Sequence, residues 1–185
     1  MSLKSIDEHL ECVKKLRDTA FCDQIEEISK ILIEAFKKNN RVLICGNGGS
    51  AADSQHLAAE WVNRFEKERD PFPAIALTTD TSLITSVSND YQYKFIYSKQ
   101  IQALARPGDV LIAISTSGNS ENIIEAIREA KKKKVTVISF TGENKCAMDE
   151  GSDFVVHAPS KRTARIQEMH ILLFHVLCEI VDQQF

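Results

Sequence analysis

The sequence lacks any long hydrophobic run, since no apolar stretch approaches the roughly 20 residues with which a helix crosses a bilayer. It also lacks the apolar region of a signal peptide, because charges interrupt the N-terminal stretch MSLKSIDEHLECVKK. These absences exclude a membrane-spanning protein. We therefore expect a cytoplasmic protein that does not contact a membrane.

An excess of charge of one sign is absent as well. The 185 residues include 23 Lys and Arg, against 26 Asp and Glu, for a formal net charge of -3. Proteins that bind nucleic acid independently of its sequence use a basic surface, so we expect no nucleic-acid partner. Hydrophobic residues make up 43% of the chain, which excludes disorder along its whole length and suits the core of one globular domain.

Paired cysteines are missing too. The five cysteines are Cys12, Cys22, Cys45, Cys146 and Cys178, an odd number with wide spacing and no C-x-x-C pair. This spacing excludes a disulfide framework and argues against a zinc site or redox motif made of cysteines. We expect reduced thiols, most of them in the core.

The first 40 residues instead show apolar side chains at helical spacing, which predicts two amphipathic helices. The apolar positions are Ile6, Leu10, Val13 and Leu16, then Ile25, Ile28, Leu32 and Phe36. Such helices can cover the core of their own chain. A pair of them before the first strand also suits an oligomer interface, so we assign residues 1–40 to a helical oligomerisation segment.

From residue 41 onward, short apolar runs alternate with helical segments. The runs predict strands at 42–45, 74–77, 110–114, 135–140 and 154–157, with covering helices at 50–65, 81–88, 119–133 and 163–184. The runs are continuous in Val, Ile and Leu, as in strands buried on both faces of a parallel sheet. The predicted fold class is therefore α/β, a three-layer sandwich with a five-stranded, flavodoxin-like parallel sheet at 41–185, within a single domain of residues 1–185.

Ligands of such sheets bind at the carboxyl ends of the strands, where two loops stand out. The first, Cys45-Gly-Asn-Gly-Gly-Ser50, is rich in glycine and opens a helix, yet lacks the lysine of a Walker A loop. It fits a dinucleotide fingerprint loosely, and a purely structural turn is the alternative. The second contains Ser115, Thr116, Ser117 and Ser120, and four hydroxyls at a helix N-terminus predict a phosphate cradle rather than an ordinary capping loop.

A third strand end offers polar residues as well. Asp80 or Thr81 can simply cap the following helix, whereas Asn89 and Asp90 could bind sugar hydroxyls.

Acid, base and metal candidates fall on two predicted helices. His56 and Glu60 are four residues apart and share one helical face. Gln167, His170 and His175 lie on the last helix, where Gln167 and His175 are about 80° and about 12 Å apart. For these two to meet at one small site, Gln167 must reach over, or a second helix must come between them.

Together these motifs resemble the phosphoheptose isomerases, which are built on the sugar isomerase (SIS) domain. The matching segments are 45–50, 55–64, 88–90, 114–120 and 165–170, so the resemblance covers essentially the whole chain. It implies a cytoplasmic homotetramer that converts sedoheptulose 7-phosphate into D-glycero-D-manno-heptose 7-phosphate, toward ADP-heptose for lipopolysaccharide core.

The resemblance also implies the roles of individual residues. Substrate contacts would be Asn47, Gly48, Gly49, Ser50, Glu60, Arg64, Asn89, Asp90, Ser115, Thr116, Ser117, Ser120 and Gln167. One zinc ion per subunit would bind His56, Glu60, Gln167 and His175. Relatives often assemble this site between subunits, which would bring Gln167 and His175 of different chains together.

The expected chemistry suits these residue types. A ketose becomes an aldose when a base removes a proton from C1 and a proton returns at C2 through a cis-enediol. Glu60 is the expected base and His175 the group that moves protons between the oxygens. One departure is Ala164, where some isomerases carry Asp, and this leaves any role of that Asp open.

Three other functions remain as alternatives. A related SIS protein that binds the bacterial replication initiator resembles this chain around 63–68 and 160–170, but it lacks the equivalents of Glu60 and His175. An SIS domain that senses a sugar phosphate would need only the cradle. A dinucleotide-dependent oxidoreductase would leave the hydroxyl-rich loop without a role.

Overall fold

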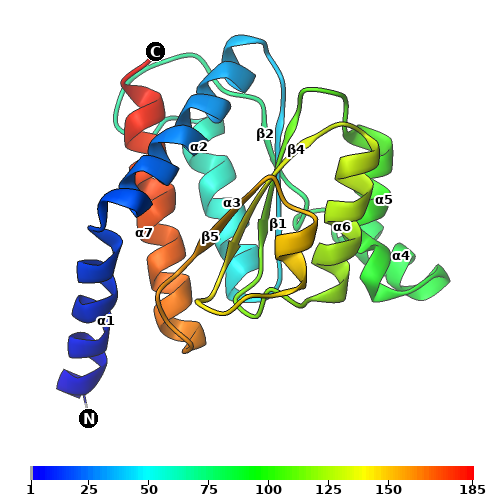
Figure 1. Ribbon diagram of the computed structural model, residues 1–185. Helices are drawn as coiled ribbons and strands as arrows, with labels where there is room; N and C mark the ends of the chain where they lie inside the picture. Colours follow the sequence, from blue (N-terminus) through cyan, green and yellow to red (C-terminus); the bar gives the residue numbers. More distant parts are fainter. Residues whose placement is uncertain (1) are drawn as a thin grey trace.

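A five-stranded parallel sheet in the order β2-β1-β3-β4-β5 lies at the centre of the computed structural model, which describes residues 2–185 (Figure 1). The strands are β1 (Val42–Gly46), β2 (Ala74–Ala76), β3 (Val110–Ile114), β4 (Thr136–Thr141) and β5 (Phe154–His157). Every residue of β1 and β3 is buried, as the continuous apolar runs predict. The predicted α/β sandwich is confirmed, and each strand end falls within one residue of its predicted position.

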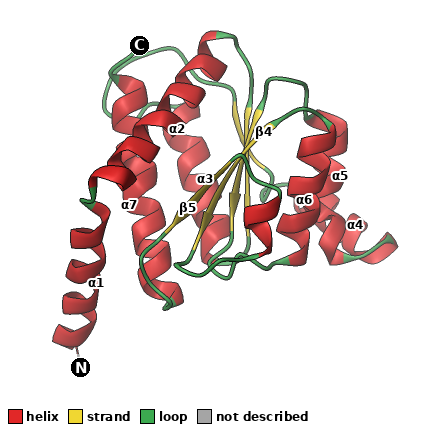
Figure 2. Ribbon diagram, in the orientation of Figure 1, coloured by secondary structure: helices red, strands yellow, loops and turns green. Residues whose placement is uncertain are grey.

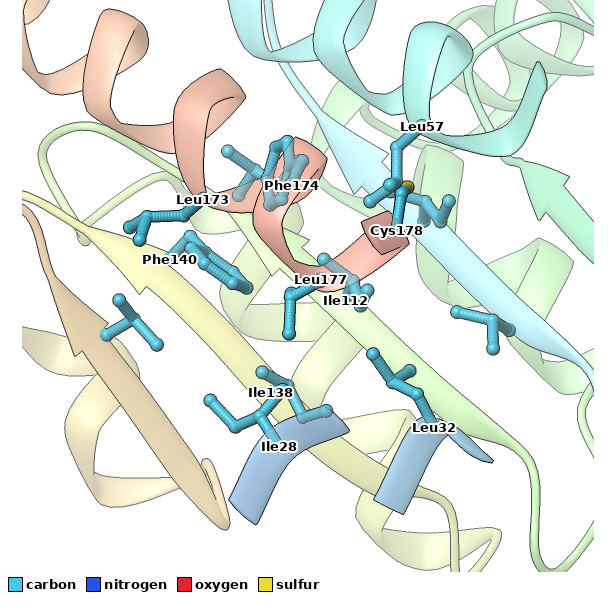
Figure 3. Close-up of a cluster of buried hydrophobic side chains, with 14 of the residues drawn as sticks. Ile28, Leu32, Leu57, Ile112, Ile138, Phe140, Leu173, Phe174, Leu177 and Cys178 are labelled. Atoms are coloured by element: carbon cyan, nitrogen blue, oxygen red, sulfur yellow. The ribbon is translucent and has the colours of Figure 1, made fainter. Parts of the chain in front are cut away.

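Helices cover both faces of the sheet (Figure 2). Within residues 2–185 they are α1 (Ser2–Leu16), α2 (Thr19–Lys37), α3 (Gly49–Val62), α4 (Thr81–Asp90), α5 (Ile96–Leu104), α6 (Glu121–Lys132) and α7 (Thr163–Asp182), with short 3-10 helices η1 (Tyr93–Phe95) and η2 (Ala147–Glu150). One core lies between the sheet and α2, α3 and α7, and Figure 3 shows Leu57, Phe174 and Cys178 in the same cluster as Ile112. The other core packs α4, α5 and α6 on the opposite face.

The sequence missed helix α5. Its polar residues Ser98 and Gln100 are buried, which breaks the apolar periodicity that marks an amphipathic helix. Gln100 is satisfied there because its Nε2 donates to the carbonyls of Leu77, at 2.8 Å, and of Ile96, at 3.0 Å. A tertiary hydrogen bond to the segment after β2 therefore replaces the missing local signal.

The cysteines and caps agree with the sequence. All five cysteines are free, and Cys12, Cys45 and Cys178 are buried. Asp80 caps α4, since its Oδ1 accepts a 2.9 Å hydrogen bond from the amide N–H of Leu83. Within residues 2–185, no helix combines the length and apolar character that crossing a bilayer requires.

Helix α1 is held to α7 by polar contacts. His9 Nδ1 lies 2.7 Å from Glu168 Oε2, and Arg165 donates to the carbonyl of Ser5 at 2.6 Å. The other side of α1 is apolar and exposed. Its ridge consists of Leu3, Ile6 and Leu10, which are 73%, 55% and 50% exposed. In the single chain this ridge covers no core, and the oligomerisation role of residues 1–40 stays a prediction.

A buried ion pair joins the C-terminal ends of α3 and α7. Arg69 Nε donates to Asp182 Oδ1 at 2.7 Å, and both side chains are almost fully buried. Arg69 also donates to the carbonyls of Glu60 and Trp61, each at 2.9 Å, and so caps α3. Burial acts to raise the pKa of Asp182, but the hydrogen bonds from Arg69 and from two loop amides outweigh it, so the pKa lies below its usual value.

We predict that Asp182→Asn lowers the free energy of unfolding by about 3 kcal/mol, because Arg69 loses its counter-charge inside the protein. The matched control, Glu34→Gln in the exposed Lys38–Glu34 pair, should change it by less than about 1 kcal/mol. Chemical denaturation measures both values.

The same pair predicts a dependence on pH. Because the folded-state pKa of Asp182 is lowered, its contribution is complete above the unfolded pKa of about 3.9 and is lost as pH falls through the folded value. Wild-type stability should therefore fall more steeply with acidification than that of Asp182→Asn. Equal slopes below pH 5 would contradict this assignment.

Candidate active site

The loops after β1 and β3 leave the sheet side by side. Strands β1 and β3 are paired from Val42 opposite Val110 to Gly46 opposite Ile114, so both loops begin at the same level. The chain continues from β1 to β2 on one side and from β3 to β4 on the other, which makes this the topological switch point of the sheet. Both predicted ligand loops therefore lie where a sheet of this order binds ligands.

The glycine-rich loop is shaped by two close constraints. Gly48 has φ +57°, a conformation that favours glycine, and it precedes the first turn of α3. A Cβ at Gly49 would lie 2.4 Å from Nε2 of Gln167, so the side chain of Gln167 rests directly on this backbone. Gln167 of α7 thus belongs to the loop end of the molecule.

Asn47 links the glycine-rich loop to the first turn of α6. Its amide and that of Asn122 exchange hydrogen bonds of 2.9 and 2.7 Å, and its Oδ1 also accepts from the hydroxyl of Tyr93 at 3.1 Å. Both lone pairs of Oδ1 are then in use, and one N–H is left to donate to a ligand. Asn122 and Tyr93 were not among the predicted site residues, because neither belongs to a local motif.

The hydroxyl-rich loop forms the predicted cluster. Ser115 is buried, and its Oγ lies 3.0 Å from Ser120 Oγ and 3.4 Å from Ser117 Oγ. Ser120 precedes α6 without a capping hydrogen bond from its side chain, although Ser117 Oγ accepts from the amide of Asn119 at 3.2 Å. A capping loop would use the Ser120 hydroxyl, so the arrangement favours an anion cradle.

A cavity of about 270 Å³ opens beside this cradle. Three successive strand-end loops and the start of α7 enclose it. Its lining residues are Thr116, Ser117, Gly142, Glu143, Asn144, Ser160, Lys161, Thr163 and Ile166. The cavity therefore adjoins two of the four predicted phosphate-binding residues.

A second cluster lies further along α3 and α7. His56 Nε2 is 2.9 Å from Glu60 Oε1 and 3.5 Å from Nε2 of His175. The ring of Phe65 packs against that of His175 at a tilt, with ring centroids 5.4 Å apart. Two ligand atoms of a tetrahedral zinc ion with bonds of about 2.0–2.1 Å lie roughly 3.3–3.4 Å apart, close to the separation of the two imidazoles.

The predicted metal ligands are thus divided within one chain. His56 contacts both Glu60 and His175, but among residues 2–185 no group of three or more His, Cys, Asp or Glu side chains is placed to hold a metal ion. Gln167 lies against Gly49, seven residues before His56, which corresponds to about 10 Å along α3. Gln167 and His175 are therefore apart in the single chain, as their spacing on one helix predicts.

The remaining predicted residues lie at the edges of the site. Arg64 Nε lies 3.5 Å from Glu68 Oε2, so its guanidinium pairs with the following loop. Asn89 and Asp90 are exposed at the end of α4, where Asn89 donates to Asp90 at 2.9 Å. Ser50 is buried at the start of α3, and its carbonyl accepts a 2.7 Å hydrogen bond from Ser54.

Two further titratable residues lie near these clusters. His170 is fully buried, and burial lowers its pKa to about 4, so it is neutral near pH 7 and its Nε2–H donates to the Thr141 carbonyl, 3.0 Å away. Asp53 has a buried Oδ2 without a partner, and burial raises its pKa against the opposing effect of His56. The Asp-x-x-His spacing could have drawn attention to Asp53, because such residues share a helical face.

Comparisons with known proteins agree with this site. A family model described as the SIS domain matches residues 6–142. The chain is 49% identical over 171 residues to the phosphoheptose isomerase of Clostridium acetobutylicum, covering 92% of this chain and 87% of that protein. It is likewise 49% identical to the phosphoheptose isomerase of Aquifex aeolicus, covering 94% and 96% of the two chains.

Solved structures give the same relationship. The phosphoheptose isomerase of Neisseria gonorrhoeae superimposes with a TM-score of 0.92 at 38% identity, covering 98% of this chain and 97% of that one. The relatives favour an isomerase over the initiator-binding, sensing and oxidoreductase alternatives. The chain therefore belongs to the SIS-domain proteins and, within them, to the phosphoheptose isomerase family.

Proposed function

We propose that this isomerase converts sedoheptulose 7-phosphate into D-glycero-D-manno-heptose 7-phosphate, in the cytoplasm, for the synthesis of ADP-heptose and lipopolysaccharide core. The observation that carries the proposal is the contact of Glu60 with His56 and of His56 with His175, on a chain that also has a cradle of hydroxyls. A sensing protein would need the cradle alone.

The cradle would bind the phosphate of the substrate. Ser115, Thr116, Ser117 and Ser120 offer hydroxyls and backbone amides to its oxygens, next to the N-terminus of α6. The backbone of Gly48 and Gly49, together with Ser50, Arg64, Asn89, Asp90 and the free N–H of Asn47, would contact the sugar. This arrangement leaves C1 and C2 to face the acid/base residues.

The reaction requires two proton transfers between carbon and a base. The carboxylate of Glu60 takes a proton from C1, the C1–C2 double bond of the cis-enediol forms, and the same carboxyl returns a proton to C2. His175 gives a proton to the C2 oxygen and removes the one on the C1 oxygen. The imidazole of His175 and the carboxylate of Glu60 are side chains of the kind that act as general acids and bases near neutral pH.

His56, Glu60 and His175 would hold a zinc ion, one per subunit, and Gln167 would complete the set. The 3.5 Å between the two imidazole nitrogens suits two of these four donors. The ion would act as a Lewis acid that stabilises negative charge on the enediol oxygens. Since Gln167 is remote from the other three in one chain, it would come from another subunit of a homotetramer, in which the exposed α1 ridge of Leu3, Ile6 and Leu10 is covered.

We predict that Glu60→Gln lowers kcat by about 10²- to 10⁴-fold, because the amide keeps the size of the side chain and loses the proton acceptor. Calorimetry should show nearly unchanged binding of sedoheptulose 7-phosphate. The control is Glu179→Gln, an exposed carboxylate one turn beyond His175, which should retain full turnover. Near-normal turnover by Glu60→Gln would exclude Glu60 as the base.

We predict that Ser117→Ala raises KM roughly 3- to 10-fold and changes kcat less, because a phosphate contact contributes equally to the ground and transition states. Ser86→Ala, at an exposed serine of α4, serves as the control. Steady-state kinetics distinguish the two. An unchanged KM would mean that the phosphate binds elsewhere.

Chelation should abolish turnover, and added zinc should restore it, because the proposed ion stabilises charge in the transition state. Zinc should also raise the Tm of the apo protein, since a ligand that binds only the folded state stabilises it. His56→Ala should lose this Tm increase. A chelated protein with full activity would contradict the zinc site.

A further inference from the structure

The phosphate cradle contains no charged side chain. Its members, Ser115, Thr116, Ser117 and Ser120, are neutral, and the hydroxyl of Ser115 contacts those of Ser117 and Ser120. A phosphate monoester carries a charge of about -1.5 to -2 near pH 7. Such a ligand is usually paired with at least one cation, so the region around the cradle should supply one.

One cationic side chain lines the cavity beside the cradle. Lys161 shares that space of about 270 Å³ with Thr116 and Ser117, and no other Lys or Arg is among its lining residues within the described chain. The acidic residue of the cavity is Glu143, whose Oε1 lies 3.4 Å from Lys161 Nζ. The local charge is therefore balanced when no anion is bound.

Close packing holds Lys161 near the cradle. The amide of Glu143 donates to the carbonyl of Ser160 at 3.2 Å, which joins the loops after β4 and β5. A Cβ at Gly142 would lie 2.9 Å from the carbonyl oxygen of Thr116, so the loop after β4 is also pressed against the cradle. The backbone positions of Lys161 and of the cradle are thus coupled through one short bridge.

The ion pair between Lys161 and Glu143 is easy to exchange. The side chain of Lys161 is 70% exposed and that of Glu143 is 34% exposed, and the long 3.4 Å contact is open to solvent. Exposed pairs of this kind contribute little to stability. A phosphate group with nearly twice the charge of a carboxylate can therefore displace Glu143 as the partner of the ammonium group.

We propose that Lys161 is a substrate-binding residue of this enzyme. Its ammonium group exchanges its partner Glu143 for the phosphate held by Thr116 and Ser117. Glu143 competes with the substrate for the ammonium group and so weakens binding. The inference rests on the proposed function for the identity of the substrate. The part of the inference that concerns recognition of a phosphate group is independent of the proposed function.

The kinetic test uses opposite effects of two substitutions. Lys161→Met should raise KM for sedoheptulose 7-phosphate roughly 3- to 10-fold with kcat little changed, because the charge contributes to binding. Glu143→Gln should lower KM, since Lys161 is then free. The double variant should behave like Lys161→Met alone, because Glu143 acts only through Lys161. Lys145→Met, at an exposed lysine of the loop after β4 that also contains Glu143, should leave KM unchanged.

A second measurement does not depend on turnover. Inorganic phosphate should raise the Tm of the wild-type protein, and the increase should be smaller for Lys161→Met and larger for Glu143→Gln. If wild type fails to convert the sugar but shows this pattern, the proposed reaction is wrong and the inference about Lys161 stands. If Lys161→Met matches Lys145→Met in both KM and phosphate-induced Tm increase, the inference is overturned.

Discussion

The buried ion pair between Arg69 and Asp182 is the constraint on which the acid/base cluster depends. Arg69 binds the last carbonyls of α3, and Asp182 ends α7, so the pair fixes the two helix ends against each other. His56 and His175 meet at 3.5 Å only because these helices lie side by side in this register. A pair of charges inside a protein contributes little net stability compared with apolar residues, whereas removing one partner leaves an uncompensated buried charge.

The two halves of the site differ in physical character. The cradle at the loop end consists of hydroxyls, amides and glycine backbone, and Lys161 is the cationic side chain in the cavity beside it. The helix end is an ionisable cluster that is partly open to solvent. The proposed reaction assigns the phosphate to the loop end and the proton transfers to the helix end.

Much of this fold follows from local sequence patterns, while several contacts do not. Apolar runs predict all five strands, and the spacing of His56 and Glu60 predicts their shared face. Local patterns do not predict three other features, which are helix α5, the Asn47–Asn122 amide pair and the Arg69–Asp182 ion pair. Each of these joins residues that are distant in the sequence, so its partner is defined only by tertiary packing. Assigning the remaining substrate-contact and metal-ligand roles to residues relied on the family resemblance, since geometry in one chain leaves Gln167 apart from His175.

Helix α7 fixes the distance between two predicted site residues of one chain. Gln167 rests on the glycine-rich loop and His175 on His56, and uninterrupted helix joins them. Inserting one residue between them would rotate His175 by about 100° and shift it by about 1.5 Å, which would remove it from His56. Loops on the surface can change length without such an effect. Segment 167–175 therefore fixes the spacing of Gln167 and His175. Insertions and deletions among functional relatives should be confined to segments outside it.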